Sequence, residues 1–230
     1  MGAGFYWKHQ GQNESKAGTT VNAPETTINT LTTGLVGHWT FDALDISGTT
    51  VTDRGTGGND GTITGAVPAL GKLGQGMGFD GGGDYVCMGD VLAFERTDPF
   101  SLSAWVHLAT DSDVDGSIIG KMGPTPDQRG YDIYASTASW KANIRNSDSG
   151  SNGITVNGLS DIADETWHHI AVTYDGSSSA SGVTLYVDGA DDTGTTDMDT
   201  LSATIVSSAD FSMGTRNCTP SPIFDVKGVI

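Results

Sequence analysis

The most regular hydrophobic pattern in the chain lies between residues 167 and 189. Two runs of alternating apolar and polar residues, 167–174 and 183–187, flank Asp175-Gly176 and a serine-rich tip. A period of two predicts strands with one buried face, and turn residues between two such runs predict an antiparallel hairpin. We expect the buried face to contain the apolar residues that meet across the two strands: Ile170, Val172, Tyr174, Val183, Leu185 and Val187.

This hairpin, WHHIAVTYDG followed by LYVDG, closely resembles the signature hairpin of laminin G-like, concanavalin A-like domains. Several resembling blocks in the family's order are more specific than one short motif. The resemblance covers residues 34–230 and implies one all-β domain there, an antiparallel two-sheet jelly-roll sandwich preceded by an extended N-terminal arm at 1–33. The other blocks are GLVGHWTFD (34–42), which resembles the opening strand, DRGTGGNDGTITG (53–65), GKLGQGMGFDGGGDYVCMGD (71–90) and FSLSAWVHL (100–108).

Composition agrees with a sandwich of many short strands. The 230 residues include 33 glycines, and no long stretch has the periodicity of an amphipathic helix. A hydrophobic content of 36% is sufficient for a thin core between two sheets.

The charge balance is strongly acidic, with 28 Asp and Glu against 11 Lys and Arg. A net charge of −17 disfavours DNA, RNA and anionic membranes as partners. No stretch is long and apolar enough for membrane insertion, and residues 1–12 lack the plan of a signal peptide. We expect an extracellular, cell-surface or virion-surface protein whose leader has been removed or which leaves its cell by another route.

The arm at 1–33 is polar and threonine-rich and has no core-forming periodicity of its own. The resemblance implies a further acidic strand after Ile230, and its absence would leave a sheet edge unpaired. We therefore predict that residues from about Phe5 to Leu31 add a strand to an open edge, either of the same domain or of another subunit. The second version would make self-assembly through residues 1–33 part of the function.

Two cysteines leave two possibilities open. Cys87 lies in a predicted strand and Cys218 in a predicted loop. A disulfide between them would tie the first third of the domain to its end, but both cysteines could equally be unpaired.

The sequence argues against an enzyme. Glucanases of this fold carry alternating Glu and Asp on one strand, whereas the four glutamates here do not stand in that pattern. His168 and His169 are adjacent in a strand, so their side chains point to opposite faces and cannot form a joint metal site. Packing and hydrogen bonding explain this pair more simply than catalysis does.

Two segments are candidate calcium sites. Asp111, Asp113 and Asp115 form the pattern D-x-D-x-D-G, which is the first half of an EF-hand loop, but the twelfth position is Met122 instead of a bidentate Glu. An acidic solvent-exposed loop explains the pattern equally well. The family resemblance implies a second Ca²⁺ site with ligands Asp42, Asp53 and Asn59, for which ordinary turn chemistry is the alternative.

Saccharide binding requires flat aromatic faces and convergent hydrogen-bonding groups. In 100–108 the apolar stripe takes one face and leaves Trp105 and His107 on the other. Trp140 and Tyr186 are also expected to lie off the apolar stripes, so these four residues form a candidate platform on one sheet. The alternative is that they pack between or against strands.

The combined observations favour a non-catalytic, lectin-like module that binds carbohydrate or another cell-surface ligand, with calcium as a candidate cofactor. The alternative is a structural subunit of a virion or extracellular filament, with the jelly roll as building block and the N-terminal arm in the subunit contacts.

Overall fold

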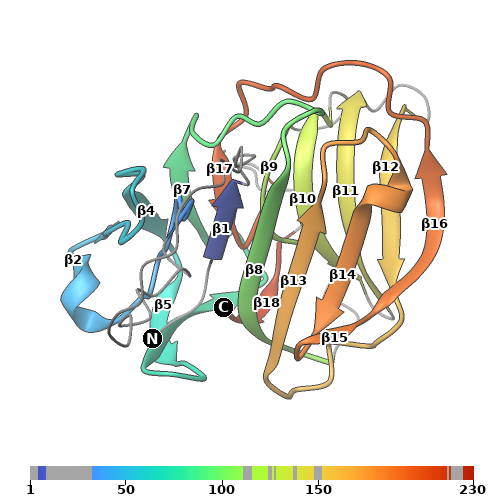
Figure 1. Cartoon of the computed structure of the whole chain (residues 1–230). Helices are drawn as coiled ribbons and strands as arrows, with labels where there is room; N and C mark the ends of the chain where they lie inside the picture. Colours follow the sequence, from blue (N-terminus) through green and yellow to red (C-terminus); the bar gives the residue numbers. More distant parts are fainter. Residues whose placement is uncertain are drawn as a thin grey trace, which may run out of the picture.

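The protein is a sandwich of two antiparallel sheets (Figure 1). The computed structural model describes the backbone of residues 5–8, and residues 33–110, 116–123, 126, 128–136, 139–147, 152–216, 218 and 225–230. Within these residues the strands are joined by turns and two short 3-10 helices, η2 (Ala43–Asp45) and η3 (Ala180–Gly182), and none forms an α-helix. The predicted all-β jelly-roll sandwich is therefore confirmed.

The front sheet in Figure 1 has eight strands and the back sheet has ten. The front sheet runs in the order β15 (Ala190–Asp191), β14 (Val183–Val187), β13 (His168–Tyr174), β8 (Phe100–Leu108), β18 (Lys227–Val229), β6 (Gln75–Asp80) and β5 (Val67–Leu70), with β1 (Phe5–Lys8) also paired to β8. The back sheet runs in the order β16 (Thr193–Asp199), β12 (Asn152–Gly158), β11 (Ser139–Ser147), β10 (Gly130–Ser136), β9 (Gly116–Met122), β17 (Phe211–Met213), β7 (Tyr85–Gly89), β4 (Gly61–Thr64), β3 (Thr50–Val51) and β2 (Ile46–Ser47).

The predicted hairpin is β13 and β14. Ile170 lies opposite Val187, and Val172 lies opposite Leu185. All four side chains are buried in the core between the sheets, which confirms the predicted register and face. The core extends through aromatic contacts, in which Phe100 packs against the ring of Tyr131 on the back sheet at 4.7 Å between ring centroids.

The edge of β8 that does not face β13 is shared by two chain segments. β18 pairs with its C-terminal end, and β1 pairs with its N-terminal end through Phe5 opposite Ser103 and Lys8 opposite Phe100. The predicted addition of an N-terminal strand to an open edge is thus confirmed for residues 5–8, within one chain. Residues 9–31 of the same prediction lie outside the described residues.

Cys87 and Cys218 form a disulfide, which settles the question that the sequence left open. Cys87 lies on β7 opposite Ser212 of β17, so the chain after β17 returns over the outward side of the back sheet. There Arg216 forms a buried ion pair with Asp132 of β10, with 2.6 Å between Nε and Oδ2. The disulfide and the ion pair together hold this segment to the sheet.

The segment 34–42 departs from the opening strand that the resemblance implied. It makes single backbone hydrogen bonds instead of a continuous ladder, from Arg54 N to His38 O and from Thr56 N to Leu35 O. Trp39 and Phe41 are nevertheless fully buried, so side-chain packing fixes the segment.

Candidate functional site

The outward face of the front sheet carries a group of aromatic and imidazole side chains at one end of β8. Trp105 and His107 of β8 are half-buried on this face. β13 places His169 opposite Trp105, with 5.2 Å between the ring centroids. Trp167, just before β13, packs against the ring of His107 at 5.5 Å. The alternation of β8 and β13 explains this grouping, because their core-facing residues leave Trp105, His107 and His169 on the other side.

A shallow hollow lies between these rings and the turn that joins β5 to β6. Lys72 in this turn places its Nζ 5.5 Å from the centroid of the Trp105 ring, which is a cation–π contact. Gly76 keeps the floor of the hollow flat, because a Cβ there would lie 2.8 Å from the carbonyl oxygen of Ile230. The lining residues are Gly71, Lys72, Leu73, Gln75, Gly76, Trp105, Trp167 and Ile230. We call this site the Trp105 hollow.

Several polar groups around the Trp105 hollow have no hydrogen-bond partner within the described part of the chain. Oε1 of Gln75 is buried without a partner, although a buried carbonyl oxygen normally accepts a hydrogen bond. The indole N–H groups of Trp105 and Trp167 and the ammonium of Lys72 likewise make no hydrogen bond to a described residue. The hollow therefore combines two indole rings with one acceptor and three donors that a ligand could satisfy.

The two histidines of the hairpin lie in different electrostatic environments. Burial lowers the pKa of His169, although the nearby carboxylate of Asp188 opposes this shift, so the ring beside Trp105 is neutral at pH 7. Burial also disfavours the charge on His168, but hydrogen bonds to Asp188 and Asp164 outweigh it and raise the pKa of His168. The prediction that the two side chains do not form a joint metal site agrees with these separate partners.

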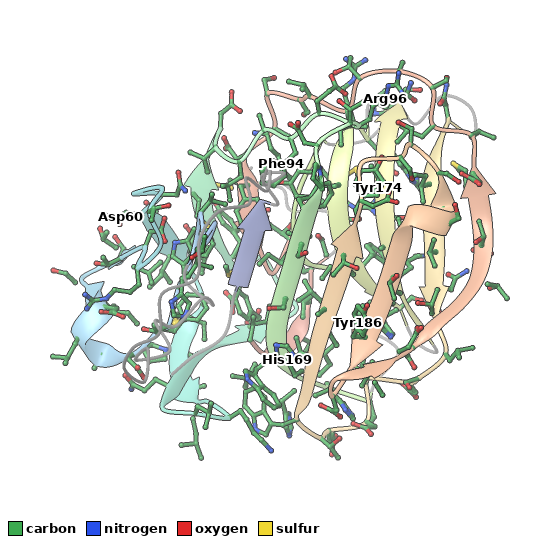
Figure 2. The ribbon with its side chains drawn as sticks, viewed as in Figure 1. Asp60, Phe94, Arg96, His169, Tyr174 and Tyr186 are labelled. Atoms are coloured by element: carbon green, nitrogen blue, oxygen red, sulfur yellow. A yellow bond between two sulfur atoms is a disulfide. The ribbon has the colours of Figure 1, made fainter. Side chains whose placement is uncertain are left out.

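The structure places three of the four predicted platform residues on one face. Trp105 and His107 border the Trp105 hollow, and Tyr186 lies on the same outward face, opposite Ala171 on the neighbouring strand. Figure 2 shows Tyr186 on β14 and His169 at the lower end of β13. Tyr186 does not line the hollow itself.

The prediction for Trp140 is wrong. Trp140 lies on β11 of the back sheet, is fully buried, and donates from Nε1 to Oδ2 of Asp192 at 2.8 Å. A buried indole has no free face for a sugar. The signal was present in the sequence, because Trp140 has the same alternation as the apolar Ala142 and Ile144, whereas Lys141 takes the opposite face.

Sequence reasoning missed Trp167, His169, Lys72 and Gln75 as members of the site. Trp167 and His169 alternate with the core residue Ile170 and could have been assigned to the outward face. Lys72 and Gln75 come from a turn far away in sequence, so only the pairing of β6 with β18, and of β18 with β8, brings them to Trp105.

The calcium candidates have different outcomes. Asp111, Asp113 and Asp115 lie outside the described residues. Asp53 accepts backbone N–H groups from His38 at 2.7 Å, Gly55 at 2.6 Å and Asn59 at 2.9 Å, so its carboxylate organises the first loop. Both the loop at 111–115 and the set around Asp53 remain predictions.

Asp42 has a similar structural role, because its Oδ1 accepts the backbone N–H of Gln75 at 3.0 Å. In the described residues, the group of His, Cys, Asp and Glu side chains close enough to share an ion contains Cys87, Asp210 and Cys218, and neither Asp42 nor Asp53 belongs to it. Its two sulfur atoms form the disulfide, so they are not metal ligands.

Among the described residues, no helix has the length and apolar character needed to cross a membrane.

Comparison with solved structures finds the same fold in proteins of low sequence identity. The binding domain of Paraclostridial Mosquitocidal Protein 1 shares 14% identity with a TM-score of 0.56, over 80% of this chain and 44% of that one. A mutant of the protein named HCR/D shares 11% identity with a TM-score of 0.51, over 80% of this chain and 46% of that one. Domains LG4-5 of the mouse laminin alpha1 chain share 14% identity with a TM-score of 0.44, over 71% of this chain and 39% of that one. The chain thus spans less than half the length of each of these structures.

No curated protein matches the sequence. The model of the concanavalin A-like lectin/glucanases superfamily, Laminin_G_3, matches residues 80–227, which is more than half of the 230 residues. Its description agrees with the two-sheet sandwich and with the residue blocks noted in the sequence. The chain therefore belongs to the concanavalin A-like lectin/glucanases superfamily, as a laminin G-like member.

Proposed function

We propose that the protein is a non-catalytic carbohydrate-binding module and that the Trp105 hollow is its ligand site. The observation that carries this proposal is the pairing of two indole rings, Trp105 and Trp167, with polar groups that have no partner in the described chain. A pyranose presents an apolar face of C–H groups and a rim of hydroxyls. The first packs on an aromatic ring, and the second satisfies donors and acceptors at the edge of the site.

The roles of the individual groups follow from their chemistry. Trp105 offers its ring as the stacking surface, and Trp167 forms the adjacent wall. Oε1 of Gln75 would accept a hydrogen bond from a sugar hydroxyl, which removes the cost of its buried, unpaired state. Lys72 would donate to a ring or hydroxyl oxygen from the open side.

A catalytic function has less support. Hydrolysis of a glycosidic bond by the retaining route needs two carboxyl groups about 5 Å apart at the scissile bond. The residues that line the Trp105 hollow include no Asp or Glu. Within the described residues, Glu95 is held by Thr204 and the backbone of Ile205, so it serves a loop contact.

An extracellular or surface location fits the proposal. The disulfide between Cys87 and Cys218 is stable in an oxidising compartment. Carbohydrate at cell surfaces is the corresponding ligand class. The net charge of −17 further favours a ligand without a large negative charge.

A glycan array, screened with and without EDTA, tests the proposal. We expect binding to one class of glycans, and loss of at least about tenfold in affinity for Trp105→Ala and for Trp167→Ala. Leu159→Ala is the matched control, because Leu159 is 73% exposed and does not line the hollow. Absence of glycan binding by the wild-type protein, or binding that both Trp variants retain, would overturn the proposal.

A further inference from the structure

β1 and β18 lie end to end along one edge of β8. Gly228 is opposite Leu108 and Val229 is opposite His107. Further along the same edge, Phe5 is opposite Ser103 and Lys8 is opposite Phe100. In both strands the residue number rises as the number of the β8 partner falls, so both run antiparallel to β8 and in the same direction (Figure 1).

The register shows that β1 continues the line of β18. Between the partners of Val229 and Phe5, which are His107 and Ser103, lie only the three β8 residues 104–106. The other edge of β8 is fully paired with β13, from Val106 to Phe100. The edge at Phe100–Ser103 is therefore a place in the front sheet that a separate extended segment fills, rather than the next strand in a hairpin.

The connection between β1 and the domain is long. Residues 9–32 separate Lys8 from the first described residue of the domain, and a chain of this length can reach at most about 80 Å. The backbone pairs between β1 and β8 are the same whether both strands belong to one chain or to two. A strand on a long connection is thus not restricted to its own domain, and exchange between copies loses no pair.

Reciprocal exchange has a further advantage. Two copies that each dock β1 on the partner's β8 form two strand contacts in one association event, and the second contact is then intramolecular. The interface is isologous, so it closes as a dimer with twofold symmetry. The surface next to the edge is neutral, with Ser101, Ser103, Ala171 and Thr173 facing outward, so it does not add to the repulsion between two chains of charge −17.

We infer that the β8 edge at Phe100–Ser103 is a dimerisation surface, and that its partner is the β1 strand of a second copy of this chain. This inference does not depend on the proposed carbohydrate function. It depends on the register of β1 and on the length of the connection.

Disulfide trapping between two differently tagged proteins tests the inference. One protein carries Trp7→Cys and the other carries Ser101→Cys, which are opposite each other in the register. After mixing at high concentration and mild oxidation, only exchange between copies joins the two tags. We expect a covalent heterodimer on a non-reducing gel, with the link between positions 7 and 101 confirmed by mass spectrometry.

The matched control replaces Trp7→Cys with Phe5→Cys, which is two residues out of register with Ser101 and beyond the distance that a disulfide spans. We expect several-fold less heterodimer from this pair. Analytical ultracentrifugation supplies a measurement without cysteine variants: the full chain should sediment as a dimer, and the chain without residues 1–8 as a monomer. A full chain that stays monomeric at every concentration, or equal trapping in both register pairs, would overturn the inference.

Discussion

Nδ1 of His168 lies 2.9 Å from Oδ2 of Asp188, and this contact joins the start of β13 to the turn that follows β14. The other ring nitrogen, Nε2, lies 3.2 Å from Oδ1 of Asp164 in the segment before β13. Only the protonated imidazole can donate to both carboxylates at once. A charged His168 therefore holds two loops on either side of β13, next to Trp167 and His169 of the Trp105 hollow.

This geometry predicts that stability falls as the pH rises through the folded-state pKa of His168. That pKa is raised above the ordinary value of 6.5, so the stabilisation is complete below the unfolded pKa and is lost above the folded one. The carboxyl groups of Asp164 and Asp188 are about half exposed, so the effect is less than about 1 kcal/mol. Thermal melts between pH 5 and pH 9 should show this decrease, and His168→Gln should remove it. An unchanged pH profile in His168→Gln would contradict the assignment.

Acid should produce the opposite trend through the carboxylates. Hydrogen bonds from the Thr166 side chain and backbone are the main cause that lowers the pKa of Asp164, while burial opposes the shift. Stability from a lowered carboxyl pKa is present above the unfolded value and is lost as the pH falls through the folded one. We expect Asp164→Asn to melt at a lower temperature than the wild type at pH 7 and to differ less from it at pH 3. Equal differences at both pH values would exclude this carboxylate as the source.

The hairpin could be predicted from sequence because each local signal agreed with the tertiary structure. Ile170 and Leu185 lie on the buried face that alternation predicted, and the turn residues stand between them. Trp140 shows where the reasoning failed, since the alternation of β11 was assigned to the wrong face. The approach of Lys72 and Gln75 to Trp105 could not be predicted, because it depends on the insertion of the C-terminal strand β18 between β6 and β8.

Charge at the core position Ile170 should destabilise the protein severely. Ile170 is fully buried opposite Val187, so Ile170→Asp places an unpaired carboxylate between the sheets and should cost about 3–5 kcal/mol or prevent folding. Thr184→Asp on the adjacent strand is the control, because Thr184 is only half-buried and faces outward. Urea denaturation should show a change within about 1 kcal/mol for the control. Comparable losses in both variants would contradict the assignment of faces.

The two tryptophans with opposite outcomes should respond differently to truncation. Trp140→Ala removes a fully buried indole and one donor to Asp192, and should cost about 3–5 kcal/mol. Trp105→Ala removes a half-buried ring from the surface and should cost at most about 2 kcal/mol. Melting temperatures measured together with glycan affinity separate the two roles. A loss of stability for Trp105→Ala as large as that for Trp140→Ala would assign Trp105 to the core.

The disulfide could not be assigned from sequence, because its two cysteines meet only through the pairing of β7 with β17. The bond closes a loop of 131 residues, for which constraint of the unfolded chain predicts about 2–5 kcal/mol of stabilisation. The double variant Cys87→Ser/Cys218→Ser should melt at a lower temperature than the wild type. Reduction with dithiothreitol should lower the wild-type melting temperature by a similar amount and leave that of the double variant unchanged. A reductant effect of equal size in both proteins would have another cause.

Calcium binding at the D-x-D-x-D-G loop is the prediction that the described residues do not address. Carboxylates at alternate positions before a glycine converge on one ion in loops of this kind. If Asp111, Asp113 and Asp115 are ligands, Ca²⁺ at 100 times its dissociation constant should stabilise the folded state by about 2.7 kcal/mol. The triple variant with asparagine at these positions should lose most of the increase in melting temperature.

General screening is the competing explanation for such an increase, because a chain of charge −17 is stabilised by any divalent cation. Mg²⁺ at the same concentration controls for screening, since it needs a strict octahedral site and keeps its waters. Asp42→Asn controls for the second candidate site. A Ca²⁺ response equal to that of Mg²⁺, or one that survives in the triple variant and disappears in Asp42→Asn, would exclude the loop at 111–115 as the calcium site.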